Sequence, residues 1–138
     1  YQAIVLKPYT YNGLYSNFQR EGKSLNDLLA WAHTRAIQEL INKIEFNRAK
    51  VIIDRFDEKK TEDRLKNLDQ TRVKIIQKTR AESETPVATA SIIAKYLFEN
   101  EVNKLDDKYE INLRNSKSAD IEPEILPHVA KLHFKNVA

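Results

Sequence analysis

The sequence predicts an α/β fold, in which helices alternate with short strands. The continuous run of β-branched apolar residues at 51–53 is typical of a strand buried in a sheet with helices on both faces, and residues 73–76 predict a further strand. Between residues 24 and 45, apolar side chains recur at helical spacing. Strands that alternate with helices along a chain indicate an α/β fold with crossover helices.

The first half of the chain supplies most of the predicted elements. Ser24-Leu-Asn-Asp27 resembles a capping box, which predicts the start of the longest amphipathic helix. The elements expected here are a strand at 3–6, a loop at 8–22 rich in Tyr, Asn and Gly, a helix at 24–45, a strand at 51–53, a charged surface helix at 58–69 and a strand at 73–76.

A further helix is predicted after Thr85-Pro86, which resembles an N-cap followed by proline in the first turn. Residues 87–94 are small or apolar on almost every side, so we expect this helix to be buried and closely packed, and to continue to about residue 107. A polar loop at 112–120 and a final helix at 125–134 complete the predicted order.

The composition excludes several kinds of site. The 138 residues include 23 Lys and Arg against 20 Asp and Glu, which gives a net charge of +3 and fits a soluble single domain with a core of its own. The absence of cysteine excludes disulfides, zinc–thiolate sites and thiol nucleophiles. Two glycines are too few for the common phosphate-binding loops.

The start of the chain and its apolar segments bear on where the protein is expected to reside. The chain contains no methionine and opens on Tyr1, so we expect that it has been processed, truncated or cut from something longer. No window approaches the roughly 20 apolar residues of a membrane span, and the start does not resemble a signal peptide. We therefore expect a cytoplasmic protein with no membrane contact.

Two carboxylates lie where an α/β sheet places its ligands. Asp54 follows the strand at 51–53, and ligands bind beyond the carboxyl ends of such strands, although Asp also commonly caps a turn there. Glu82 precedes a helix, where the helix dipole favours an acid without any function. If the two converge, they supply the oxygen ligands of phosphodiester-cleaving metal sites, with Mg²⁺ or Mn²⁺ favoured over Zn²⁺.

Basic and hydroxyl side chains near the same edge allow two interpretations. Arg80 and Lys95, beside a helix N-terminus, would suit a phosphate. Ser91 lies on the small-residue helix, where a serine more often packs and bonds back to its own turn. The residues with period-2 spacing would suit a nucleic-acid backbone or a solvated sheet face: Arg72, Lys74, Lys78 and Arg80.

Four segments resemble the type 2 ribonucleases H, most closely ribonuclease HIII, in the right order over nearly the whole chain. The resemblance rests on Thr79-Arg-Ala-Glu82 with the following Pro86–Phe98, on Val129–Asn136, on Val51-Ile-Ile-Asp54-Arg-Phe56, and on Leu28–Ala36.

The resemblance implies an endonuclease that cuts the RNA strand of RNA–DNA hybrids with Mg²⁺ or Mn²⁺. It implies a ribonuclease-H-like three-layer fold with a mixed central sheet, incomplete at the amino end, and residues 1–138 as a partial catalytic domain. Asp54 and Glu82 match two of the four catalytic, metal-binding carboxylates of the family. Arg80, Ser91 and Lys95 are the residues expected at the nucleic acid.

Departures from the family pattern qualify this expectation. The Asp-Glu pair of the family's first strand has no counterpart in the sequence, and the glycine-rich turn expected within 112–127 is missing. We therefore expect little or no hydrolysis by this chain alone. The alternative is a non-catalytic nucleic-acid-binding or assembly module that self-associates through an open sheet edge.

Overall fold

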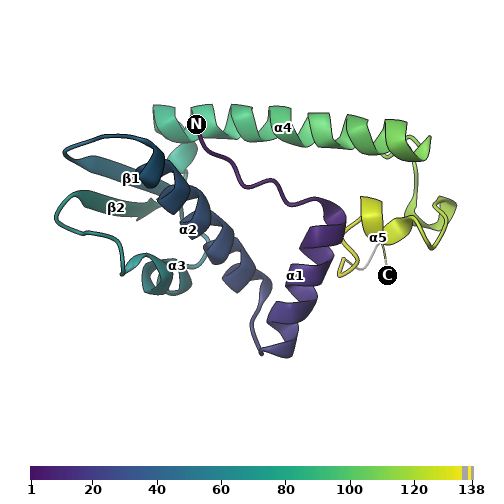
Figure 1. Cartoon of the computed structure of the whole chain (residues 1–138), viewed down its shortest axis with the longest axis horizontal. Coiled ribbons are helices and arrows are strands. Elements are labelled where there is room, and N and C mark those ends of the chain that lie inside the picture. Colours follow the sequence, from purple (N-terminus) through teal and green to yellow (C-terminus); the bar gives the residue numbers. More distant parts are fainter. Residues whose placement is uncertain (135–136, 138) are drawn as a thin grey trace. The chain divides into compact units, whose positions relative to one another are not determined.

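The structure is a computed structural model, which describes residues 1–134 and 137. Its elements in chain order are α1 (Pro8–Arg20), α2 (Leu25–Lys43), β1 (Ala49–Asp54), α3 (Glu58–Leu65), β2 (Val73–Lys78), the 3-10 turn η1 (Ala81–Ser83), α4 (Thr85–Tyr109), the 3-10 turn η2 (Ser118–Asp120) and α5 (Leu126–Val129) (Figure 1). The chain divides into two units. The first unit comprises residues 1–4 and 23–94, and the second comprises residues 5–22 and 95–138.

The sheet of the first unit is formed by β1 and β2, which run parallel. Ala49 lies opposite Val73 at one end, and Asp54 lies opposite Lys78 at the other. The crossover through α3 confirms the predicted strand–helix–strand unit. Because side chains alternate across a pleated strand, Ile53 and Val73, which are 4% and 3% exposed, share the covered face of the sheet.

The core of the first unit lies where α2 and α3 meet each other. Leu28 of α2 and Leu65 of α3 are each 1% exposed, and Thr61 is fully buried. The range predicted for α2 is confirmed to within two residues, as is its cap, because the Ser24 backbone N–H donates to Asp27 Oδ2 at 2.7 Å. The predicted helix at 58–69 is confirmed but ends earlier, at Leu65.

An ion pair ties the first turn of α2 to α3. Lys60 Nζ donates to Asp27 Oδ2 at 2.7 Å and to Ser24 Oγ at 2.8 Å. The hydrogen bond from Lys60, with that from the Ser24 backbone, lowers the pKa of Asp27 from 3.8 to about 2. The ionised carboxylate is therefore favoured in the folded chain.

We expect Asp27→Asn to lower the free energy of unfolding by about 1 kcal/mol at neutral pH, after allowance for solvent screening of a partly exposed pair. A lowered carboxyl pKa stabilises the fold above about pH 4, and that contribution is lost as the pH falls through about 2. Urea unfolding followed by the fluorescence of Trp31, the single tryptophan, measures the difference at both pH values. A difference that is the same at neutral pH and near pH 2 contradicts this account, and Asp63→Asn on the exposed side of α3 is the control.

The second unit begins with α1, where the sequence had indicated a loop. That prediction was wrong, because Tyr11, Leu14, Tyr15 and Phe18 recur at helical spacing and Pro8 suits the first turn. Tyr11 is 4% exposed. Gly22, with φ of 73°, follows the helix in the left-handed conformation that commonly ends one.

A side-chain clasp holds the carboxyl-terminal segment on α1. Asn12 Nδ2 donates to the carbonyl oxygens of Pro127 at 3.0 Å and Ala130 at 2.8 Å, while the Leu132 backbone N–H donates to Asn12 Oδ1 at 3.0 Å. The Tyr11 hydroxyl is hydrogen-bonded to His133 Nε2 at 2.7 Å. Of the predicted helix at 125–134, only the four residues of α5 are helical, because Ala130 is extended and the Leu132 backbone N–H bonds to Asn12 instead of continuing the helix.

Two further predictions of structure were wrong. Residues 3–6 do not form a strand, because the only sheet among the described residues pairs β1 with β2 and leaves this apolar run without a partner strand. The helix α4 covers the predicted range, yet none of its residues is buried, and Ile92 is 71% exposed. The apolar composition of a helix shows that its surface can pack against another element. It does not show that another part of the described chain covers that surface.

Candidate functional site

The candidate site is built around Asp54, the last residue of β1. Its side chain is exposed, and its Oδ1 accepts a hydrogen bond from the Ala81 backbone N–H at 3.2 Å. Ala81 is fully buried, so this bond fixes the start of η1 against the carboxyl end of the sheet. Asp54 thus anchors a turn, as the capping interpretation predicts, and does so at the sheet edge where α/β folds bind ligands.

Glu82 follows Ala81 directly within η1 and is exposed. The turn that brings it there depends on Arg80, which has φ of 52° and ψ of 43°, a left-handed conformation uncommon for a residue with a side chain. The structure therefore places the backbone of Glu82 one residue from the group that hydrogen-bonds Asp54. Arg80 itself is exposed at the amino end of η1.

A second pair borders this edge. Lys78, the register partner of Asp54, extends its Nζ to Glu84 Oε1 at 2.7 Å. The hydrogen bond from Lys78 lowers the pKa of Glu84. Glu84 is thus held as the partner of a lysine, which separates its role from that of Glu82.

The donor set limits which metal site can form. Among residues 1–134 and 137, no group of three or more His, Asp or Glu side chains could hold a metal ion. Mg²⁺ keeps several of its waters and is commonly held by one or two carboxylates, so the exposed carboxylates of Asp54, at the end of β1, and Glu82, in η1, are the kind of donors that suit a single hydrated Mg²⁺ or Mn²⁺. They do not fit two adjacent ions, which need more carboxylates.

The remaining predicted site residues lie on α4. The Ser91 hydroxyl donates to the Val87 carbonyl oxygen at 3.1 Å, the bond back to its own turn that the sequence had suggested. Lys95 is exposed, four residues further along the same helix face. Contact of either residue with nucleic acid stays a prediction, as it does for Arg80.

Two lysines share a sheet face with Asp54: Lys74, which the period-2 pattern had singled out, and Lys50, which sequence reasoning missed. Lys50 and Lys74 are register partners and are both exposed, and the alternation of side chains puts them on the face of Asp54 and Lys78. The available signal was Lys50 directly before the apolar run at 51–53. Like charges directly opposite one another are unfavourable, unless an anion lies between them.

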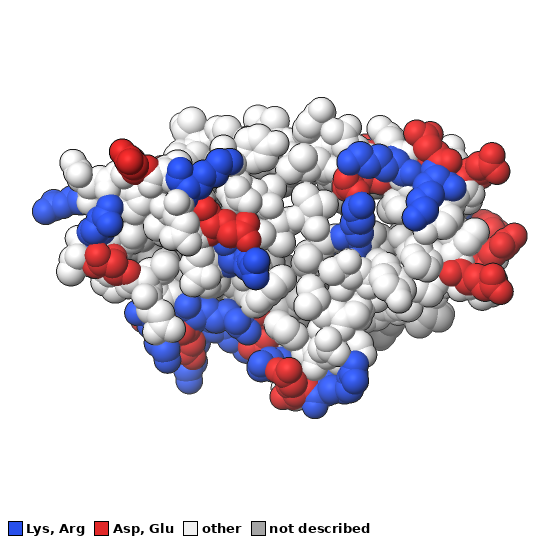
Figure 2. Space-filling model, in the orientation of Figure 1, with Lys and Arg blue, Asp and Glu red and all other residues white. Residues whose placement is uncertain are grey.

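The basic stripe predicted by period-2 spacing is only partly formed. Lys74 and Lys78 lie in β2, but Arg72 precedes the strand and Arg80 follows it. On the face shown in Figure 2, basic and acidic side chains are interspersed. Of the predicted stripe, only Lys74 and Lys78 therefore lie within a strand.

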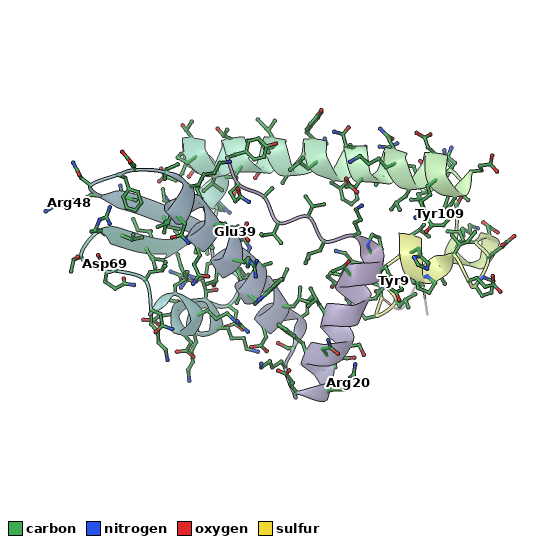
Figure 3. All side chains as sticks on the ribbon, in the orientation of Figure 1. Tyr9, Arg20, Glu39, Arg48, Asp69 and Tyr109 are labelled. Atoms are coloured by element: carbon green, nitrogen blue, oxygen red, sulfur yellow. The ribbon has the colours of Figure 1, made fainter. Side chains whose placement is uncertain are left out.

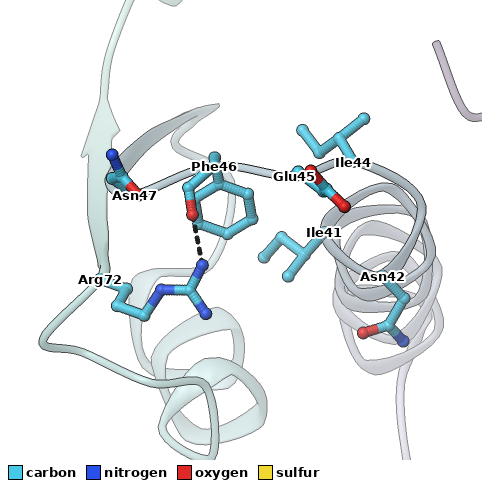
Figure 4. Close-up of a pocket in the computed structure, with 7 residues that line it drawn as sticks. All are labelled: Ile41, Asn42, Ile44, Glu45, Phe46, Asn47 and Arg72. Carbon is cyan, nitrogen blue, oxygen red and sulfur yellow. Dashed lines mark hydrogen bonds between the residues drawn. The ribbon is translucent and has the colours of Figure 1, made fainter.

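A pocket of about 530 Å³ in the first unit is lined by neither Asp54 nor Glu82. The Arg72 guanidinium donates to the Phe46 carbonyl oxygen and lies 4.7 Å from the centre of the Phe46 ring, as Figure 4 shows. Phe46 and Arg72 precede β1 and β2, so this pocket lies at the amino ends of the strands, opposite the ligand-binding edge of such sheets. Its lining residues are Ile41, Asn42, Ile44, Glu45, Phe46, Asn47 and Arg72.

The crossover sheet with carboxylates at its carboxyl edge places the chain in the class of α/β proteins whose sites lie at strand ends. Its sequence matches the family described as Ribonuclease HII over residues 4–137, and the chain belongs to this family. The resemblance inferred from the motifs is thereby confirmed. No helix of the described residues is both long enough and apolar enough to cross a membrane.

Curated relatives and solved structures agree with this family. The chain is 37% identical to ribonuclease HIII of Chlamydia pneumoniae and 34% identical to that of Chlamydia abortus, over 96% and 98% of this chain but 47% of each relative. The crystal structure of Bst-RNase HIII in complex with Mn²⁺ superposes with a TM-score of 0.74 at 29% identity, over 97% of this chain and 47% of that one. The chain thus spans about half the length of these relatives and has their ribonuclease-H-like fold.

Proposed function

We propose that this chain forms part of the catalytic centre of an endonuclease that cuts the RNA strand of RNA–DNA hybrids. The observation that carries the proposal is the hydrogen bond between Asp54 and Ala81, which holds the turn of Glu82 at the carboxyl end of β1. The similarity to ribonuclease HIII, including one relative crystallised with Mn²⁺, supports the same activity.

In this proposal Asp54 and Glu82 are metal-ligating carboxylates of the catalytic centre. A bound Mg²⁺ or Mn²⁺ would activate water and stabilise charge on the phosphate. The protein's own contribution is to hold the turn of Glu82 at the end of the strand that carries Asp54, with both side chains exposed to solvent.

The nucleic acid is held by positive charge and hydrogen bonds in this proposal. Lys50 and Lys74 face the backbone on the side of the sheet that carries Asp54, and Arg80, Ser91 and Lys95 provide further contacts. Such contacts read the A-like shape and the 2′-hydroxyls of a hybrid, not its base sequence. The cytoplasm is the proposed location.

Hydrolysis by the 138-residue chain alone is expected to be slight or absent, because two carboxylates do not fix a pair of metal ions. In this view residues 1–138 are a partial ribonuclease-H-like catalytic domain. Incubation of the purified chain with a labelled RNA–DNA hybrid and Mn²⁺ measures this. Robust cleavage would contradict the expectation that Asp54 and Glu82 alone are too few carboxylates for hydrolysis.

Metal binding tests the site itself. We expect Mn²⁺ added to the isotope-labelled chain to broaden the backbone NMR signals of Asp54, Ala81 and Glu82 first, because the ion is paramagnetic. Asp54→Asn should weaken Mn²⁺ binding by at least about tenfold, since it removes a charged ligand.

The matched control for the metal test is Asp63→Asn, which makes the same change at an exposed position on α3 and should bind Mn²⁺ as the unchanged chain does. If Asp54→Asn also leaves the affinity and the broadened signals unchanged, the proposed metal site is wrong.

A non-catalytic nucleic-acid-binding or assembly module is the second candidate. It is favoured by the lack of a three-carboxylate group among the described residues and by the two-stranded sheet, whose outer edges are open to pairing with another chain. On this view hybrid binding persists in Asp54→Asn and does not depend on the metal. Sedimentation of the purified chain measures the self-association.

A further inference from the structure

The second unit presents an aromatic group that the metal site does not use. The Tyr9 ring stacks on the His128 ring, with centroids 4.7 Å apart and planes within 4° of parallel. The ring of Tyr109, the last residue of α4, also lies beside His128, with the two ring centroids 6.1 Å apart. We call these three residues the aromatic platform. Figure 3 labels Tyr9, near the start of α1, and Tyr109, at the end of α4.

The outer face of Tyr9 is open. Its side chain is 63% exposed although His128 covers one face of the ring, so the remaining surface faces solvent. An aromatic ring with one face backed by a parallel partner and the other face free has the geometry of a stacking surface for one more planar ring.

The platform is held in place before any ligand binds. His128 belongs to α5, which the Asn12 clasp joins to α1 through the carbonyl oxygens on either side of it, those of Pro127 and Ala130. Tyr11, one turn from the start of α1, is joined to His133. Little conformational freedom is therefore lost when a ring stacks on Tyr9, which favours affinity.

Cations accompany the rings. Lys108 Nζ lies 5.2 Å from the centre of the Tyr109 ring, and the exposed Lys7 directly precedes α1. Lys131 Nζ lies 4.5 Å from the ring of the adjoining Tyr11. Among the nearby acids, Glu101 is paired with Lys104 at 2.7 Å. Exposed aromatic rings with lysines beside them are the combination that binds single-stranded nucleic acid, since bases stack and the lysines attract the phosphates.

We propose that the aromatic platform of Tyr9, His128 and Tyr109 binds unpaired nucleobases of a single-stranded nucleic acid. Bases inside a duplex have both faces covered by their neighbours, so the platform selects a strand that is not paired. This surface is independent of the metal site, and it adds a single-strand contact to the proposed cleavage of hybrids.

Fluorescence anisotropy of the intact chain with a labelled single-stranded oligothymidylate tests the platform. We expect Tyr9→Ala to weaken binding roughly 5- to 150-fold, the range for loss of one base–aromatic stack. Tyr9→Phe keeps the ring and should bind as the unchanged chain does. Tyr9→Leu keeps an apolar side chain without an aromatic face and should lose affinity as Tyr9→Ala does.

Tyr96→Ala is the matched control, because Tyr96 is exposed to a similar degree, 64%, and lies outside the platform. The proposal is overturned if Tyr96→Ala weakens binding as much as Tyr9→Ala, if Tyr9→Leu binds normally, or if the unchanged chain does not bind the oligothymidylate.

Two further probes separate stacking from other causes. An abasic oligomer, which has phosphates but no bases, should bind the unchanged chain and Tyr9→Ala equally, and a loss with this probe counts against stacking. Asp54→Asn should bind the oligothymidylate normally, so that failure of the metal site does not affect this result.

Discussion

Asn12→Ala is expected to lower the free energy of unfolding of the second unit by about 2–3 kcal/mol, because it removes three hydrogen bonds worth about 1 kcal/mol each. The amide of Asn12 donates to Pro127 and Ala130 and accepts from Leu132, so one side chain satisfies three backbone groups of the carboxyl-terminal segment. Without it these groups bond only to water, and the segment loses its attachment to α1. Hydrogen exchange of the Leu132 backbone amide is the most direct measurement.

Two variants separate the clasp from a general effect of mutating α1. Asn17→Ala changes an exposed asparagine of the same helix and should cost no more than about 0.5 kcal/mol. Asn12→Asp keeps an acceptor for the Leu132 N–H but places a carboxylate oxygen against the carbonyl oxygens of Pro127 and Ala130, so it should destabilise the clasp at least as much as Asn12→Ala does. If Leu132 exchanges at the same rate in Asn12→Ala and in the unchanged chain, the clasp does not hold the segment.

The strands and the longest helix could be predicted because their signals are local. Val51–Ile53 is a run of β-branched residues without a polar interruption, and the helix from Leu25 carries both a cap and a continuous apolar stripe. Propensity, periodicity and capping all favour the same element at these positions. Agreement among independent signals is what makes such elements readable.

The segments whose structure was predicted wrongly depend on contacts between residues distant in sequence. The helix α1 contains Gly13 and two asparagines, which favour a loop, but Tyr11 is buried and Asn12 bonds to residues more than a hundred positions away. The apolar run at 3–6 has strand character but lacks a partner strand among the described residues. In both cases tertiary contacts decide against the local preference.

The candidate site was predictable in part. Asp54 follows a recognisable strand, and the family pattern in the sequence singles out Glu82, whereas the bond from Ala81 that links their turns could not be read from the sequence. The pairing of Lys50 with Lys74 was also missed, because it depends on the register between the strands. A shift of one residue would move one of the two lysines to the opposite face.

The register that pairs Lys50 with Lys74 leads to a prediction about the binding of nucleic acid. We expect Lys50→Gln combined with Lys74→Gln to weaken binding of an RNA–DNA hybrid roughly 10- to 100-fold at about 0.1 M salt, since each lost phosphate contact lowers affinity about eightfold there. The slope of log affinity against log salt concentration should fall by about 2, which is 1 for each lysine. Fluorescence anisotropy over a series of salt concentrations measures both quantities.

The cross-strand position of the two lysines distinguishes a binding role from a structural one. Because they lie opposite each other, their neutralisation relieves repulsion and should leave the fold equally or slightly more stable, by a few tenths of a kcal/mol. Lys59→Gln with Lys66→Gln removes the same charge from exposed positions at α3 and should leave the salt slope nearly unchanged. Equal losses in the two double variants would mean that net charge alone binds the hybrid, whereas a loss confined to Lys50 and Lys74 assigns the backbone contact to the sheet face that carries Asp54.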